Sequence, residues 1–168
     1  MKLTRHLAAA IVVLAIGAAA AFYRPGNTQQ AAPDVSFTRL DGSTARLAQL
    51  RGKVVLVNFW ATTCAICVKE MPQMVATHRK FSSRGYETLA VAMSYDPPVS
   101  VVSFTESRRL PFTVVIDNTG AVARSFGDVA LTPTSVLINK RGEIVKRYVG
   151  EPDFAALHQL VEELLAEV

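Results

Sequence analysis

The only two cysteines of this 168-residue chain lie in one segment, Asn58-Phe59-Trp60-Ala61-Thr62-Thr63-Cys64-Ala65-Ile66-Cys67-Val68-Lys69-Glu70-Met71-Pro72. An apolar, β-branched run, residues 54–59, leads into the pair, and a helix-forming stretch follows it. Two thiols spaced C-x-x-C where a strand gives way to a helix are typical of a redox-active dithiol. The free N–H groups and positive dipole end of the helix favour a thiolate on the first cysteine. The second lies one turn further on and can attack a mixed disulfide that the first one makes.

Three other roles for the two cysteines fit the sequence less well. A structural disulfide between cysteines so close in sequence closes a very small loop and adds little stability. A zinc site needs about four ligands, and His6, His78 and His158 show no ligand spacing relative to the pair. Covalent haem attachment needs a histidine directly after the second cysteine, where this chain has Val68. The redox-active dithiol is therefore the favoured interpretation, with no metal or cofactor expected.

The net charge of +4 comes from the N-terminal segment. Lys2, Arg5 and Arg24 lie there, which leaves 15 basic against 14 acidic residues from Pro25 onward. There is no basic patch with interleaved aromatic residues, so the sequence predicts no nucleic-acid partner.

The N-terminus reads as a membrane-targeting segment, residues 1–24. Residues 7–23 run without a charge after a short basic start, which predicts a membrane anchor and an exported domain. Residues 18–20, Ala-Ala-Ala, would also satisfy a signal-peptide cleavage rule, so a cleaved signal stays open. No lipobox cysteine is present. We expect residues 25–33 to form a polar linker and residues 34–168 to form the folded domain.

Downstream, strand and helix patterns alternate. The predicted elements are a hairpin (35–39 and 44–47, around Asp41-Gly42), a strand (54–59), a helix (from 62–64, capped by Thr62 or Thr63, to about 82–85), a strand (86–93), a helix (100–108), a strand (113–116), a helical turn (122–126), two hairpin strands (135–139 and 144–149) and an amphipathic helix (154–168). Alternating elements of this kind predict an α/β sheet with parallel neighbours, helices on both faces and an antiparallel edge.

The chain resembles the thioredoxin superfamily, and within it the exported, membrane-anchored thiol-disulfide proteins of the TlpA/ResA/CcmG type. The resemblance runs from about Pro33 to the C-terminus. It is carried by residues 57–72 and by the loop Leu131-Thr132-Pro133-Thr134 followed by residues 135–138, Ser-Val-Leu-Ile. It implies a thioredoxin-like fold, a central mixed sheet flanked by helices, with an N-terminal β-hairpin extension.

The resemblance also implies roles for single residues. Cys64 would be the exposed nucleophile and Cys67 the buried resolving thiol. Pro133 would be cis and face the disulfide, with the Thr132 backbone and Trp60 on the side that binds the client. A cis proline is rare and exposes backbone groups that an extended partner can use. The residues alone leave open that Pro133 is an ordinary proline at the start of a strand.

Glu70 lies three residues after Cys67, on the same helix face. A carboxylate there could take the proton that the resolving thiol must lose, and many relatives carry Glu at this spacing. Asn58 stands where thioredoxin itself has a buried acid, which increases the importance of Glu70. The alternative is a solvated glutamate on the helix surface.

The favoured function is an exported thiol-disulfide reductase acting on a disulfide-containing client protein. The resemblance implies a membrane thiol transporter as electron donor, and clients such as apocytochrome c or copper-site cysteines. Ala65 and Ile66 supply no charge to stabilise a thiolate, which argues against a strong oxidant.

Two alternatives use the same fold. A thiol peroxidase would need Pro and Thr upstream of the reactive cysteine, where Val57 and Ala61 stand. A copper chaperone could add Met71 or Met74 to the two thiols, although methionines there are more often core residues.

Overall fold

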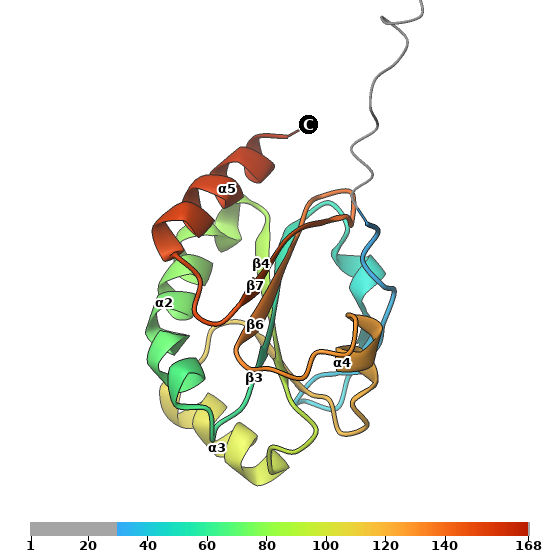
Figure 1. Cartoon of the computed structure of the whole chain (residues 1–168), viewed down its shortest axis with the longest axis vertical. Coiled ribbons are helices and arrows are strands. Elements are labelled where there is room, and N and C mark those ends of the chain that lie inside the picture. The colour runs from blue at the N-terminus through green and yellow to red at the C-terminus, as the bar shows by residue number, and fades with distance from the viewer. Residues whose placement is uncertain (1–29, 168) are drawn as a thin grey trace, which may run out of the picture.

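The structure is a computed structural model that describes residues 30–167 (Figure 1). The predicted anchor or signal segment, residues 1–24, and most of the linker lie outside the described residues. Within residues 30–167, no helix has the length and apolar character needed to cross a membrane.

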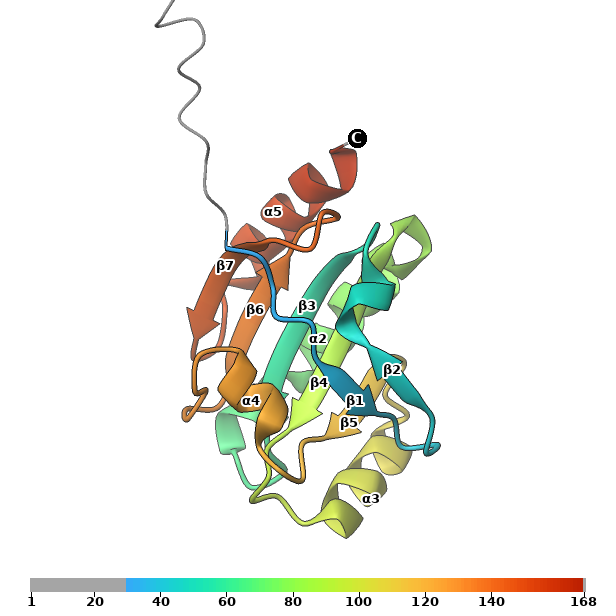
Figure 2. The same cartoon turned by 90° about the vertical axis from the view of Figure 1, so that its right-hand side faces the viewer.

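A five-stranded mixed sheet forms the centre of the domain, with the strand order β5-β4-β3-β6-β7. β3 pairs in parallel with β4, and β4 with β5, whereas β6 and β7 are antiparallel to their neighbours. A separate hairpin, β1 with β2, lies in front of the sheet in Figure 2. The strands are β1 Ser36–Thr38, β2 Thr44–Arg46, β3 Val54–Trp60, β4 Tyr86–Ala92, β5 Thr113–Ile116, β6 Thr134–Ile138 and β7 Ile144–Val149.

Helices cover the two faces of the sheet unequally (Figure 1). α2, α3 and α5 lie on one face, and the short α4 lies with the hairpin on the other. The helices are η1 Leu47–Leu50, α2 Ala65–Phe81, η2 Ser82–Arg84, α3 Pro98–Arg108, α4 Ala121–Ser125 and α5 Phe154–Ala166. This is the thioredoxin-like arrangement with an N-terminal hairpin that the sequence predicts.

The central strand β3 is fully buried, and its side chains alternate between two cores. Val55, Val57 and Phe59 belong to the core under the hairpin and α4. Val54, Leu56 and Trp60 belong to the core under α2 and α5. Asn58 alternates in the same way as Val54, Leu56 and Trp60. The one polar side chain of this strand therefore points toward the face that α2 covers.

The end of the predicted linker is in contact with the folded domain. The Ile144 N–H donates to the carbonyl of Gln30 at 2.7 Å, and the Ala32 N–H donates to the carbonyl of Gly142 at 2.8 Å. Ala31 forms a bridge with Glu143. Residues 30–32 therefore lie against the start of β7, and the chain enters the domain at this edge.

Candidate active site

Cys64 and Cys67 form a disulfide at the N-terminus of α2. Cys64 is the N-cap residue, and its sulfur accepts a hydrogen bond from the Cys67 backbone N–H at 3.2 Å. The prediction that Thr62 or Thr63 caps this helix is therefore wrong. The cap falls on Cys64 itself, which brings its sulfur to the N–H groups and positive dipole end of α2, where a thiolate would be stabilised.

The two sulfurs differ in their access to solvent. Cys64 is half-buried, whereas Cys67 is fully buried in the core under α2. An external disulfide can therefore reach Cys64 and not Cys67 in this conformation. Trp60 is also fully buried and packs against Phe104, with 5.2 Å between the ring centroids. Its side chain thus lies in the core and offers no surface to a client, contrary to the expected place on the client side.

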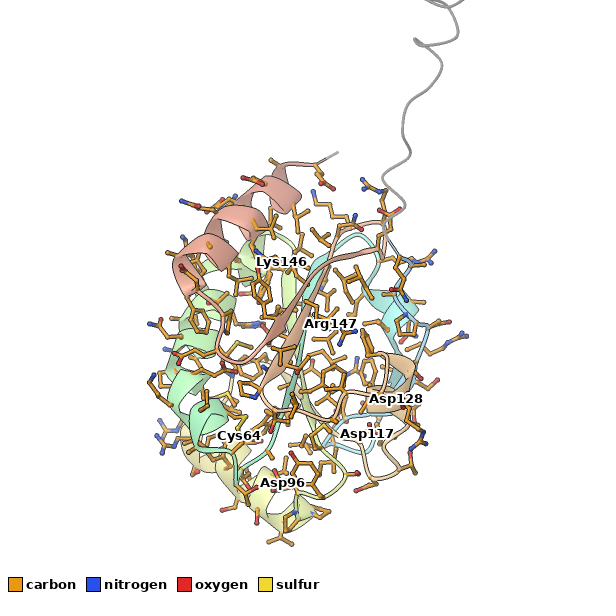
Figure 3. All side chains as sticks on the ribbon, viewed as in Figure 1. Cys64, Asp96, Asp117, Asp128, Lys146 and Arg147 are labelled. Carbon is orange, nitrogen blue, oxygen red and sulfur yellow. A yellow bond between two sulfur atoms is a disulfide. The ribbon has the colours of Figure 1, made fainter. Side chains whose placement is uncertain are left out.

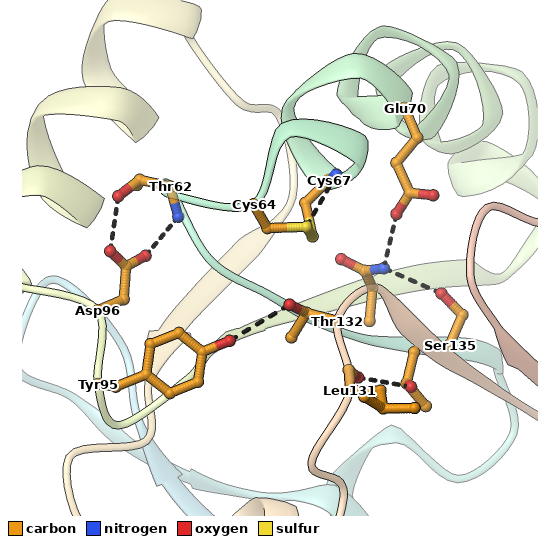
Figure 4. The surroundings of a disulfide bond; sticks show 11 residues. Thr62, Cys64, Cys67, Glu70, Tyr95, Asp96, Leu131, Thr132 and Ser135 are labelled. Carbon is orange, nitrogen blue, oxygen red and sulfur yellow. Dashed lines mark hydrogen bonds between the residues drawn. A yellow bond between two sulfur atoms is a disulfide. The ribbon is translucent and has the colours of Figure 1, made fainter.

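A buried polar chain lies to one side of the cysteine pair and runs from α2 through β3 to β6 (Figure 4). The Asn58 side-chain amide donates to Oε1 of Glu70 at 3.1 Å and to Oγ of Ser135 at 2.9 Å. Asn58 and Ser135 are direct partners in the antiparallel pairing of β3 with β6, which brings their side chains together. Glu70 is 1% exposed, so it is a core residue and not a solvated helix charge.

The environment of Glu70 favours its protonated form. Burial raises the pKa of Glu70 from 4.5 to about 7, the hydrogen bond from Asn58 opposes this rise, and the negative charge of Glu151 adds to it. Oε2 of Glu70 has no hydrogen-bond partner among the described residues. A carboxyl group with a pKa near neutrality can both accept and release a proton at physiological pH. It lies one helical turn beyond the buried Cys67 on α2.

The loop before β6 carries the predicted proline. The peptide bond between Thr132 and Pro133 is cis, as the resemblance implies. Phe59 pairs with Thr134, so Pro133 and Thr132 continue alongside the end of β3 that leads to Cys64. Leu131, next to Thr132, is exposed at this edge. The loop and the turn before Cys64 therefore form neighbouring parts of one surface.

The loop between β4 and α3 forms a further wall of the site, which the sequence analysis did not identify. Both carboxylate oxygens of Asp96 accept hydrogen bonds from Thr62, and the Tyr95 hydroxyl lies 3.2 Å from Oγ1 of Thr132 (Figure 4). The sequence Asp96-Pro97-Pro98 reads only as a strand stop. The available signal was that Asp96 follows a buried strand parallel to β3, because the carboxyl ends of such strands meet at one edge.

The methionines of α2 are core residues. Met71 and Met74 are almost fully buried in the core beneath α2 and α5. Neither is therefore exposed to bind copper together with the two cysteines. Among residues 30–167, no group of three or more His, Cys, Asp or Glu side chains is placed to hold a metal ion.

The sheet order, the cysteine pair at the start of α2 and the proline loop beside the end of β3 define a thioredoxin-fold protein that exchanges dithiols and disulfides. The Redoxin family model matches residues 27–161, and the chain belongs to this family. It is a thiol-disulfide oxidoreductase, and it is similar to the thiol-disulfide oxidoreductase ResA of Bacillus thuringiensis subsp. konkukian. The two are 33% identical over 133 residues, which is 79% of this chain and 76% of the relative.

Two solved structures share the fold. A candidate thioredoxin from Neisseria meningitidis is 44% identical, with a TM-score of 0.75 over 81% of this chain and 90% of that one. A thiol:disulfide interchange protein of the thioredoxin family from Chlorobium tepidum is 28% identical. Its TM-score is also 0.75, over 82% of this chain and 97% of that one.

Proposed function

We propose that the protein is a disulfide reductase that works outside the cytoplasm, held to the membrane by residues 7–23. The observation that carries the catalytic part is the pairing of a half-exposed Cys64 with a buried Cys67 that lies one turn before a carboxyl group with a pKa near 7. Such an arrangement separates the attacking thiol from the resolving thiol and supplies a proton acceptor for the second.

In the proposed cycle, the Cys64 thiolate attacks one sulfur of a client disulfide. The client S–S bond breaks, the attacked sulfur forms a mixed disulfide with Cys64, and the other client sulfur leaves as a thiolate. Cys67 then loses its proton to Glu70 and attacks the sulfur of Cys64. This attack releases the client sulfur that was bound to Cys64, also as a thiolate. Two electrons pass from the protein to the client, and the Cys64–Cys67 disulfide of the structure is the oxidised product.

The client would bind as an extended segment across the loop of Thr132 and Pro133. The position of this loop beside the turn before Cys64 supports this role, because an extended partner can pair with backbone groups at such an edge. Candidate clients are haem-attachment cysteines of apocytochrome c and cysteines of copper sites. Because exported compartments are oxidising, an integral-membrane thiol transporter would return two electrons by the reverse exchange.

The reduction potential of the Cys64–Cys67 pair tests the direction of electron flow. Equilibration of the purified protein with dithiothreitol or glutathione buffers, followed by thiol alkylation and mass measurement, gives this potential. We expect a value near that of thioredoxin, about −270 mV. A value near about −120 mV, as in the strong oxidant DsbA, would contradict the reductase and favour an oxidase.

A further inference from the structure

Asp96 is a buried carboxylate whose two strong hydrogen bonds both go to the turn that presents the nucleophile. It is 2% exposed and follows β4. Its Oδ2 accepts from the Thr62 backbone N–H and its Oδ1 accepts from the Thr62 hydroxyl, each at 2.6 Å. Figure 4 shows both bonds on the segment that leads to Cys64.

The bonded segment is a tight turn. β3 ends at Trp60, and the Cys64 N–H donates to the carbonyl of Ala61 at 3.1 Å, which closes a turn over residues 61–64. Thr62 is the second residue of that turn. Because Asp96 binds both its backbone and its side chain, the orientation of the turn relative to the sheet is fixed from the neighbouring strand.

Asp96 is itself held at the same edge. Its N–H donates to the carbonyl of Met93 at 2.9 Å, and the Met93 N–H donates to the carbonyl of Trp60 at 3.0 Å. Among residues 30–167 it forms no ion pair with Lys, Arg or His. A buried carboxyl group without a cation depends on hydrogen bonds to offset its lost hydration, and Thr62 donates two of them.

The preceding residue of the same loop, Tyr95, reaches the other side of the site. Tyr95 is 57% exposed, and its hydroxyl lies 3.2 Å from Oγ1 of Thr132 in the cis-proline loop. Two consecutive residues therefore link the turn of the nucleophile to the loop beside the proline. The distance between these two parts of the surface is thus set by the loop between β4 and α3.

We propose that Asp96 is a positioning residue for disulfide exchange, which acts by holding Thr62 so that Cys64 keeps its sulfur at the start of α2 and in line with an incoming disulfide. Exchange requires the attacking sulfur and both sulfurs of the client to be aligned, and a displacement of about 1 Å can cost about 100-fold in rate. The inference rests on exchange through Cys64 and not on the client or on the direction of electron flow.

The variants Asp96→Ala, Asp96→Asn, Thr62→Val and Thr62→Ser test this role. Each is assayed in the reduced full-length protein for its exchange rate with a synthetic disulfide peptide and, when oxidised, for thermal unfolding. We expect Asp96→Ala to slow exchange by about 10- to 100-fold. Asp96→Asn should restore much of the rate, because its oxygen can accept from the Thr62 N–H and its NH₂ can donate to the Thr62 hydroxyl. Thr62→Val should be slower than Thr62→Ser.

Asp117→Ala is the matched control. Asp117 is also a buried carboxylate, 4% exposed, and it accepts from the backbone N–H groups of Val122 and Ala123 at 3.2 and 2.8 Å. Those bonds hold the start of α4 and not the turn of Cys64 (Figure 3). This variant should lose thermal stability like Asp96→Ala but exchange disulfides at close to the unchanged rate.

Three results would overturn the proposal. They are an unchanged exchange rate in folded Asp96→Ala, an equal loss of rate in Asp117→Ala, and no rescue by Asp96→Asn. If Asp96→Ala does not fold, the comparison of Thr62→Val with Thr62→Ser tests the proposal instead. Thr62→Val keeps the Asp96 carboxylate and its hydrogen bond from the backbone N–H of residue 62. Equal exchange rates for Thr62→Val and Thr62→Ser would then contradict the role. Failure of the reductase proposal would appear separately, in the reduction potential of the unaltered protein.

Discussion

The side-chain amide of Asn58, on β3, donates a hydrogen bond to Oε1 of Glu70, on α2, at 3.1 Å, and both side chains are fully buried. The amide of Asn58 is a neutral hydrogen-bond donor. An acid or a cation at this position would instead change the net charge around Glu70. Glu70 therefore keeps a pKa near neutrality, raised by burial and held back by this single bond.

Glu70→Gln should slow the resolution of the mixed disulfide more than the initial attack. Gln keeps the size of the side chain but cannot take the proton from Cys67, so the loss should reach at most the ~10²–10⁴-fold typical of a positioned base. Stopped-flow measurement of both phases near pH 7 checks this, with the alkylation rate of Cys64 as the control that should stay unchanged. Equal turnover in the variant would leave Glu70 without a part in proton transfer.

Cys64→Ser should abolish disulfide exchange, whereas Cys67→Ser should accumulate mixed disulfides with clients. The half-exposed sulfur is the one that a client can reach, and removal of the buried thiol removes the group that resolves the adduct. Non-reducing gels and mass spectrometry after incubation with a disulfide peptide detect the adduct. Faster alkylation of Cys67 than of Cys64 in the reduced protein would reverse these roles.

The raised pKa of Glu70 also predicts a pH-dependent difference in stability between the wild type and Glu70→Gln. Below about pH 4.5 both the folded and unfolded states carry the proton, so Glu70 contributes no pH dependence. Between pH 4.5 and about 7 the folded state keeps a proton that the unfolded state has lost, so this group makes the wild type less stable as the pH rises.

The shift from 4.5 to about 7 corresponds to about 3 kcal/mol of unfolding free energy. Urea unfolding of the oxidised proteins at pH 4 and pH 8 measures it. The stability of Glu70→Gln relative to the wild type should increase by about this amount across that range. A relative stability that does not change with pH would show that Glu70 has an ordinary pKa in the folded state.

Asn58→Leu should raise the pKa of Glu70 further, because the hydrogen bond that favours the ionised carboxylate is lost while burial remains. Carbon-detected NMR titration of the Glu70 carboxyl measures the change. Ser135→Ala is the control, because Ser135 accepts from the same amide without touching Glu70 in any recorded bond. Its effect on the pKa of Glu70 should be the smaller one, and the reverse order would contradict this account.

Residues 1–23 should hold the full-length protein to the membrane with the domain outside the cytoplasm, since a short basic start precedes an uncharged run. Membrane fractionation and protease protection of intact cells and spheroplasts check the location. N-terminal sequencing of the purified protein checks whether the segment is retained. A mature N-terminus near Ala21 would rule out the anchor and leave a released, exported form.

The architecture was predictable from the sequence because it depends on local patterns. The strands at 113–116 and 144–149 have the predicted bounds, and the buried run at 54–59 gains only Trp60. Alternating elements and the family resemblance then suffice for the fold. The sequence spacing also placed Cys67 and Glu70 one helical turn apart, and the structure has both buried on α2; their roles stay predictions.

The parts of the site that were missed depend on contacts between distant residues. Thr62 looked like a helix cap because its hydroxyl had no visible alternative, yet its partner Asp96 lies 34 residues away. Ser135 meets Asn58 across 77 residues through the register of two strands. Trp60 is the last residue of the fully buried strand β3. Its side chain therefore lies in the core, although it stands only four residues before Cys64.

The presence of only two cysteines, three positions apart, has a consequence for biogenesis. Two thiols in one chain admit a single intramolecular pairing, so the polypeptide cannot become trapped in a scrambled isomer while it folds among oxidants. Early oxidation would close only a short ring at the start of α2 and leave β3 free to find its partners. Folding of this chain therefore calls for no disulfide isomerase, and the non-native disulfides open to its cysteines are links to other molecules.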